Sequence, residues 1–108
     1  MRGTLGTHVL DAATGSPAAG VPVVLQAQDG SQLASAQTDS DGRIVELYAR
    51  LEVGIYRLTF DTGRYFASTG TKGFYPEISI TFDVMDADRH HHVPVLLSPY
   101  AYSTYLGS

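Results

Sequence analysis

The most informative segment of this chain reads His90-His-His-Val-Pro-Val-Leu-Leu-Ser-Pro-Tyr-Ala-Tyr-Ser-Thr-Tyr-Leu-Gly-Ser108. It predicts two β-strands joined at Ser98-Pro99, because Pro99 has no donor N–H and favours a corner over a continuing central strand. In a strand, side chains at every second position share one face. The first strand therefore has a core face made of Val93, Val95 and Leu97, and an opposite face made of His90, His92, Pro94 and Leu96.

The second strand of this stretch is rich in residues that favour strands, Tyr-Ser-Thr-Tyr. Alternation places Ser103, Tyr105 and Gly107 on one face of it. Two histidines, a serine and a tyrosine are thus predicted on the non-core faces of adjacent strands. Such a surface is either solvated or a functional site.

Outward from this stretch, turn signals divide the rest of the chain into short strands. Ala12 to Gly20 is small and turn-rich and predicts a loop, while Asp29-Gly30 and Asp39-Ser-Asp-Gly42 predict turns. One short helix is expected from Asp61 or Thr62 to about Ser68. About eight short strands with one helix predict an all-β sandwich that forms a single domain over residues 1–108. The strands expected before the closing pair are 6–11, 21–28, 32–38, 43–47, 55–60 and 77–84.

Composition narrows the class of protein. The formal net charge of −4 argues against a nucleic-acid or anionic-membrane surface, which is normally basic. The chain has no cysteine, which excludes a disulfide framework and thiol-ligated metal. No apolar run approaches the roughly 20 residues of a membrane helix, and the N-terminus lacks the apolar segment of a secretory signal. A soluble, cytoplasmic protein is expected.

Three side chains are candidates for chemistry. His8 is predicted on the non-core face of the first strand because Val9 is its core residue, Arg43 directly follows a glycine turn, and His92 lies on the non-core face described above. Each has a plain alternative as a solvated surface group. His90 shares the face of His92, but two ligands without a third make a poor metal site, so no metal is predicted. No Gly-x-Ser-x-Gly elbow of a serine hydrolase occurs.

Several segments together resemble the transthyretin-like family, and within it the 5-hydroxyisourate hydrolases. The resemblance covers nearly the whole chain, and its closing motif is long and specific. The matching segments are Thr7-His-Val-Leu-Asp11, Gly15-Ser-Pro-Ala-Ala-Gly20, Asp41-Gly-Arg43, Phe74-Tyr-Pro-Glu77, Ile80-Thr-Phe82, and His92 to Tyr105.

The resemblance implies a transthyretin-like β-sandwich of two four-stranded sheets, with the first, fourth, seventh and eighth strands in one sheet. It also implies a homotetramer, built as a dimer of dimers, in which that sheet lines a channel. Leu10, Pro94, Leu96 and Tyr105 would form an apolar patch on this face of an isolated subunit.

The implied activity is hydrolysis of 5-hydroxyisourate, an intermediate of urate degradation, to 2-oxo-4-hydroxy-4-carboxy-5-ureidoimidazoline, without a cofactor. The implied catalytic residues are His8, Arg43 and His92, and we expect Ser103, Tyr105 and Ser108 to bind substrate. His92 is the expected general base, aided or replaced by His8, because an unperturbed imidazole titrates near neutral pH. Arg43 would orient the substrate and stabilise developing charge.

Two other hypotheses stay open. A transthyretin-like carrier without catalysis would share the fold, although carriers of this family replace the His, Arg and His positions. A structural β-sandwich with incidental histidines predicts that His8, Arg43 and His92 lie apart.

The chain departs from the family pattern at two positions. The family ends Tyr-Arg-Gly-Ser, whereas this chain has Leu106 in place of the arginine. A lost direct contact with an anionic substrate would cost about 1–3 kcal/mol; alternatively, the arginine serves assembly, because alternation puts position 106 on the face opposite Tyr105. The usual tyrosine is His91, which falls on the core-facing side and is interpreted as a packing variation.

Overall fold

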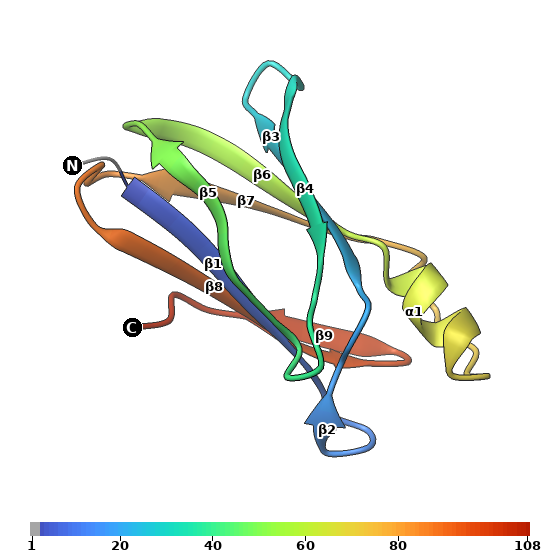
Figure 1. Ribbon diagram of the computed structural model, residues 1–108. Helices are drawn as coiled ribbons and strands as arrows, with labels where there is room; N and C mark the ends of the chain where they lie inside the picture. The colour runs from blue at the N-terminus through green and yellow to red at the C-terminus, as the bar shows by residue number, and fades with distance from the viewer. Residues whose placement is uncertain (1–2) are drawn as a thin grey trace.

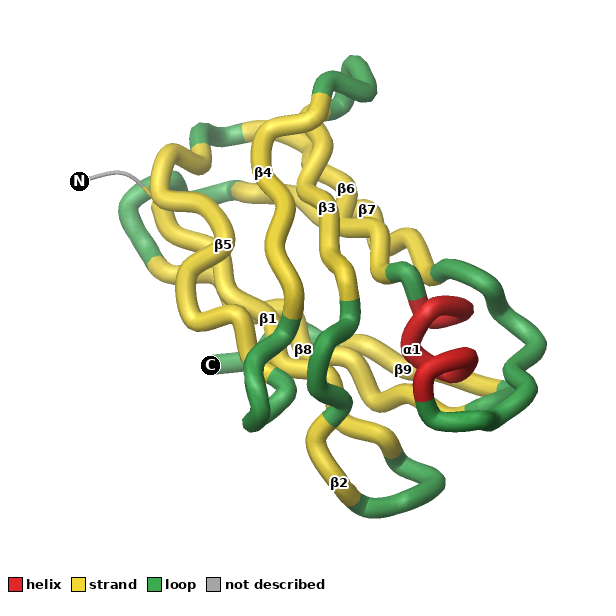
Figure 2. The backbone as a smooth tube through the Cα atoms, turned by 45° about the vertical axis from the view of Figure 1, so that its right-hand side comes forward, coloured by secondary structure: helices red, strands yellow, loops and turns green. Residues whose placement is uncertain are grey.

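Nine strands and one short helix make up most of the computed structural model, which describes residues 3–108 (Figure 1). The strands form two sheets that face each other, and the helix lies at one end of the sandwich (Figure 2). Their bounds are β1 Gly3–Asp11, β2 Ser16–Pro17, β3 Pro22–Ala27, β4 Gln32–Gln37, β5 Arg43–Leu51, β6 Gly54–Phe60, α1 Thr62–Ser68, β7 Ile78–Val84, β8 His90–Ser98 and β9 Ala101–Thr104.

The first sheet is built around β1. This strand pairs in parallel with β8 along its whole length, from Thr4 opposite His90 to Asp11 opposite Leu97. Its other edge pairs with β5 and then with β2, while β9 pairs with β8. The predicted grouping of β1, β5, β8 and β9 in one sheet is confirmed. The two-residue β2 makes this a five-stranded sheet rather than a four-stranded one, and it lies where a loop was expected.

The second sheet has the order β4-β3-β6-β7 and is antiparallel throughout. It has the four strands that were expected. β5 in the first sheet is longer than the predicted 43–47, because it continues to Leu51. Its ladder with β1 shifts register twice, and such irregularities break the two-residue alternation on which the prediction relied.

The core lies between the two sheets and is aliphatic with a few aromatic rings. Val9 of β1 and Val93, Val95 and Leu97 of β8 are all buried, which confirms the predicted core face of both strands. Pro94 is buried as well, although it was expected in an exposed apolar patch. Other fully buried side chains include Leu5, Val23, Leu25, Leu51, Leu58, Phe60, Ile78 and Val84.

Helix α1 begins as predicted, with Asp61 as its N-cap: the carboxylate of Asp61 accepts a hydrogen bond from the N–H of Arg64 at 3.0 Å. Its Tyr65 hydroxyl donates to the buried Asp11 carboxylate at 2.9 Å, which ties the helix to the end of β1. Burial, followed by this hydrogen bond, raises the pKa of Tyr65 to about 12. Within residues 3–108, no helix is long and apolar enough to span a membrane.

Candidate active site

The pairing of three strands places His8, Arg43 and His92 on one face of the first sheet. His8 lies opposite Arg43 on β5 and opposite Pro94 on β8. Paired residues project to the same side of a sheet, and His92 is two residues from Pro94, so its side chain shares this face about 7 Å along the strand. The three predicted groups therefore lie on neighbouring strands, contrary to the hypothesis of scattered, incidental histidines.

The turn before β5 holds His8 and Arg43 together. The Nε2–H of His8 donates to the carbonyl oxygen of Asp41 at 3.0 Å, which leaves Nδ1 as the acceptor of the neutral ring. The carboxylate of Asp39 accepts from the N–H of Asp41 and of Arg43, both at 2.9 Å. One hydrogen-bonded turn thus orients the first imidazole and the start of the strand that carries the guanidinium.

His92 is half-buried, and its surroundings disfavour the charged ring. Burial lowers its pKa below the ordinary value of 6.5, and the positive charges of Arg43, His90 and His8 lower it further. These three neighbours come from β5, β8 and β1. At neutral pH the imidazole of His92 is therefore mostly unprotonated and able to accept a proton.

His92 has two further neighbours: His90, which was predicted on the same face but given no role, and Gly6, which sequence reasoning missed. His90 stacks on it with ring centroids 6.5 Å apart, and Nδ1 of His90 is hydrogen-bonded to the Thr4 hydroxyl at 2.6 Å. Gly6 lies opposite His92 on β1, so no side chain fills the space beside the imidazole on that strand. A glycine inside a strand signals close backbone approach: a Cβ on Gly6 would come 2.6 Å from the Val45 carbonyl oxygen.

Of the three predicted substrate-binding residues, Ser103 lies well along the sheet from His92, whereas Ser108 directly follows Gly107, which pairs with His92. Ser103 pairs with Leu96 and shares the face, but Leu96 is four residues beyond His92, roughly 13 Å along the strand. Tyr105 and Ser108 are exposed. Among residues 3–108, no hydrogen bond joins these three side chains to His8, Arg43 or His92.

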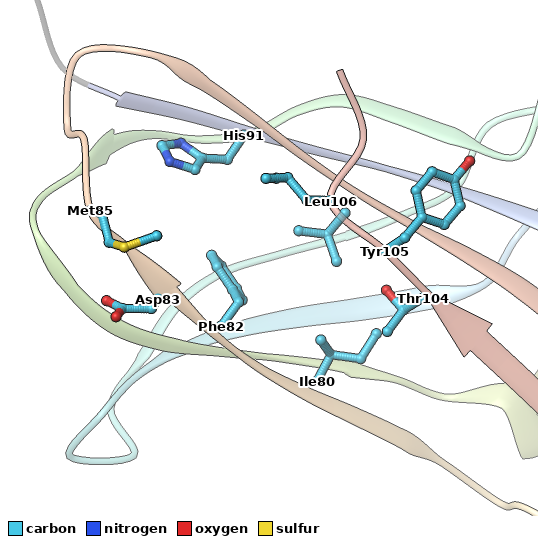
Figure 3. Close-up of a pocket in the computed structure, with 9 residues that line it drawn as sticks. Ile80, Phe82, Asp83, Met85, His91, Thr104, Tyr105 and Leu106 are labelled. Carbon is cyan, nitrogen blue, oxygen red and sulfur yellow. The ribbon is translucent and has the colours of Figure 1, made fainter.

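Tyr105 and Leu106 both line a cavity of about 340 Å³ at the open edge of the sandwich, between β7 and the C-terminal tail. Figure 3 shows Leu106 near Ile80 and Phe82, with the Tyr105 hydroxyl pointing away from them. Alternation was expected to put position 106 on the face opposite Tyr105; although β9 ends at Thr104, the bridge between Gly107 and His92 keeps the register of the β8–β9 ladder and agrees with this expectation.

His91 also lines this cavity, where it is buried with no hydrogen-bond partner for Nδ1. Its predicted position on the core-facing side of β8 is confirmed. Leu106 and His91, the two departures from the family pattern, thus meet on the side of β8 that faces away from His92.

Comparison with known proteins agrees with this fold. A model described as the HIUase/Transthyretin family matches residues 5–107. The chain is 46% identical to a 5-hydroxyisourate hydrolase from Salmonella dublin over 109 residues, covering 96% of this chain and 80% of that protein.

Two solved structures represent both branches of this family. The 5-hydroxyisourate hydrolase of Klebsiella pneumoniae superimposes with a TM-score of 0.89 at 41% identity, covering 98% of this chain and 94% of that one. Sea bream transthyretin in complex with thyroxine has a TM-score of 0.87 at 33% identity, covering 95% and 93%. With a family model matched over nearly its whole length, the chain belongs to the HIUase/transthyretin family.

Proposed function

We propose that this chain is a 5-hydroxyisourate hydrolase that acts as a single domain and needs no cofactor. The observation that carries the proposal is the convergence of His8, Arg43 and His92 on one sheet face, with the pKa of His92 lowered. A neutral imidazole beside a fixed cation suits attack of water on a carbonyl carbon. The hydrolases named above, 41–46% identical to this chain, support the same substrate.

In the proposed mechanism, His92 accepts a proton from water while the water oxygen bonds to C6 of 5-hydroxyisourate. The N1–C6 bond then breaks, and the imidazolium returns the proton to N1. His8, held by the Asp41 carbonyl at 3.0 Å, assists by orienting the water or the ring. A base whose pKa lies near or below working pH is available in the form that the reaction needs.

Arg43 has the second role in this mechanism. Arg43 lies opposite His8 in the β1–β5 ladder, and an arginine side chain carries a positive charge at all relevant pH values. It orients the substrate and stabilises the negative charge that develops on the attacked carbonyl oxygen. The same charge disfavours protonation of His92, so that one group both binds substrate and keeps the base unprotonated.

We also propose that the chain assembles as a homotetramer, a dimer of dimers, with this face turned towards a second subunit. His8 and His92 are half-buried and Arg43 is exposed, so the site is an open surface in one subunit. Water-excluding walls strengthen the electrostatic interactions on which such chemistry depends. Exposed Val45 and Leu96 on the same face give a second subunit apolar surface to cover.

The decisive test is ultraviolet monitoring of freshly prepared 5-hydroxyisourate. Wild-type protein should accelerate its decay, and His92→Ala should abolish most of that acceleration. Arg57→Ala is the control, because Arg57 lies on β6 in the second sheet and is not among the groups of the proposed site. An unchanged decay rate with His92→Ala would refute the assignment of the base.

The transthyretin–thyroxine complex favours a second candidate, a small-molecule carrier without catalysis. One experiment distinguishes the two functions, because a carrier would bind ligand saturably and leave the decay of 5-hydroxyisourate unchanged.

The cytoplasmic location stays a prediction, which fractionation of cells expressing the tagged chain would test.

A further inference from the structure

The chain returns to β8 after the last strand ends. Gly107 and His92 form an isolated antiparallel bridge, and the N–H of Gly107 donates to the carbonyl oxygen of His92 at 2.9 Å. This bridge continues the register of the β8–β9 ladder, in which Val95 lies opposite Thr104. Gly107 therefore lies beside the residue that we propose as the general base.

The imidazole of His92 lies against the Cα of Gly107. A Cβ at position 107 would come 2.4 Å from Cδ2 of His92, 3.0 Å from Cγ and 3.3 Å from Cβ. Atoms of real side chains do not approach so closely, so any residue other than glycine would displace the ring or the tail. Gly107 is itself buried in this contact.

Backbone conformation does not explain this glycine. The glycines with positive φ are Gly15, Gly20, Gly30, Gly42, Gly54 and Gly70, and Gly107 is not one of them. An alanine at position 107 would meet no penalty from its φ angle. Glycine is therefore required at position 107 because the His92 imidazole occupies the space that a Cβ would fill.

We infer that Gly107 is a positioning residue. Because Gly107 has no side chain, the His92 imidazole packs directly against its main chain, a contact that we call the seat. This contact fixes the direction of the proton-accepting nitrogen of His92. The inference rests on the function proposed above. His90 stacks on the same ring from along β8, with centroids 6.5 Å apart, so the imidazole is restrained from two directions. A restrained base keeps its geometry towards the reacting atoms without loss of rotamer freedom during the reaction.

The contact between Gly107 and His92 is also relevant to Leu106, which replaces the arginine of the family pattern. Main-chain atoms form the seat, and the side chain of Leu106 lies in the cavity on the other side of β8, with His91. The orientation of His92 therefore does not depend on an arginine at position 106.

The first test compares Gly107→Ala with Leu106→Ala, a control that changes the adjacent tail residue without adding an atom beside His92. Gly107→Ala should lower kcat by roughly 10²-fold with little change in KM, since a small misplacement of a catalytic group has this effect. The ring signals of His92 in ¹H–¹³C spectra should shift, and its pKa should rise towards the ordinary value as the ring gains solvent. Leu106→Ala should leave both unchanged.

A double-mutant cycle tests the contact even where turnover is lost. The closest approaches of the added methyl group, at 2.4 Å and 3.0 Å, are to the His92 ring, so Gly107→Ala should lower the melting temperature of wild type clearly more than that of His92→Ala. An equal loss in both backgrounds, or a Gly107→Ala variant with unaltered kcat and His92 spectrum, would overturn the inference. Absence of turnover in wild type would count against the proposed function, and the cycle would still decide on the seat.

Discussion

His92 combines half-burial with three basic neighbours, so its protonation state is the property of this site most open to measurement. Removing a nearby positive charge makes protonation easier. We expect Arg43→Gln to raise the pKa of His92, and any residual activity to be lost at a higher pH as the solution is acidified. An NMR titration of the His92 ring checks this, with Arg57→Gln in the second sheet as control. An unchanged titration would exclude Arg43 as a cause of the lowered pKa.

Leu106 lies over the cavity that contains His91, on the side of β8 away from His92. We expect Leu106→Arg to change kcat/KM by less than about tenfold, which corresponds to about 1.4 kcal/mol. Steady-state kinetics on 5-hydroxyisourate provide the measurement. A gain well above tenfold would favour the alternative in which the family arginine contacts substrate directly.

Alternation predicted the orientation of single residues well wherever a strand is regular. His8, Val9, His91 and Val93 lie on the expected faces. The rule also holds beyond the end of β9 at Thr104, because the bridge between Gly107 and His92 keeps the register of the β8–β9 ladder. The seat at Gly107 was not predictable, since a contact between residues on separate strands depends on register, which periodicity alone does not give.

At the scale of an element, the turn before β5 depends on Gly42, which has φ of 74° and whose Cβ would lie 2.4 Å from the Val9 carbonyl oxygen. We expect Gly42→Ala to lower the free energy of unfolding by well over about 1 kcal/mol and to reduce kcat/KM, because Arg43 would be displaced. Gly30→Ala is the matched control: its φ is also positive, at 90°, but nothing lies within 4 Å. Urea denaturation should show a clearly larger loss for Gly42→Ala, and equal losses would exclude the clash as a cause.

Helix α1 is fastened to the first sheet by the hydrogen bond from Tyr65 to Asp11. Tyr65→Phe removes the donor and leaves a buried carboxylate with fewer partners, so the free energy of unfolding should fall by about 1–3 kcal/mol. Chemical denaturation measures this. Tyr100→Phe, at an exposed turn, should have no effect, and a similar absence of effect at Tyr65 would contradict the role of the bond.

Elements with strong local signals were predictable, including the helix that follows the Asp61 cap and the hairpins at Asp29-Gly30 and Ser98-Pro99. β2 was not, because a strand of two residues has no period to detect. The extension of β5 to Leu51 was hidden by the register shifts against β1. The grouping of β1 and β8 in one sheet came from family resemblance, and their parallel pairing was not predicted, because local sequence does not specify which distant strand is a neighbour.

For the whole molecule, the proposed assembly covers the face that carries the site. Val45 is 73% exposed on β5, two residues from Arg43, whereas Val53 is 70% exposed in the turn before β6. We expect Val45→Glu to dissociate the tetramer and lower activity, since a charge would be buried without a partner. Val53→Glu should leave both unchanged. Sedimentation velocity and the ultraviolet assay measure the two effects, and a wild-type chain that is monomeric at micromolar concentration would refute the assembly.

The parallel ladder between β1 and β8 has a kinetic consequence. Thr7 donates a hydrogen bond to the Val93 carbonyl across 86 positions of sequence, and the site extends over the same two strands. Contacts between such distant segments require the closure of a long loop, and proteins dominated by them fold slowly. During translation β1 is synthesised long before β8. Catalytic activity should therefore appear only after the last strands have been synthesised, and should not increase gradually with chain length.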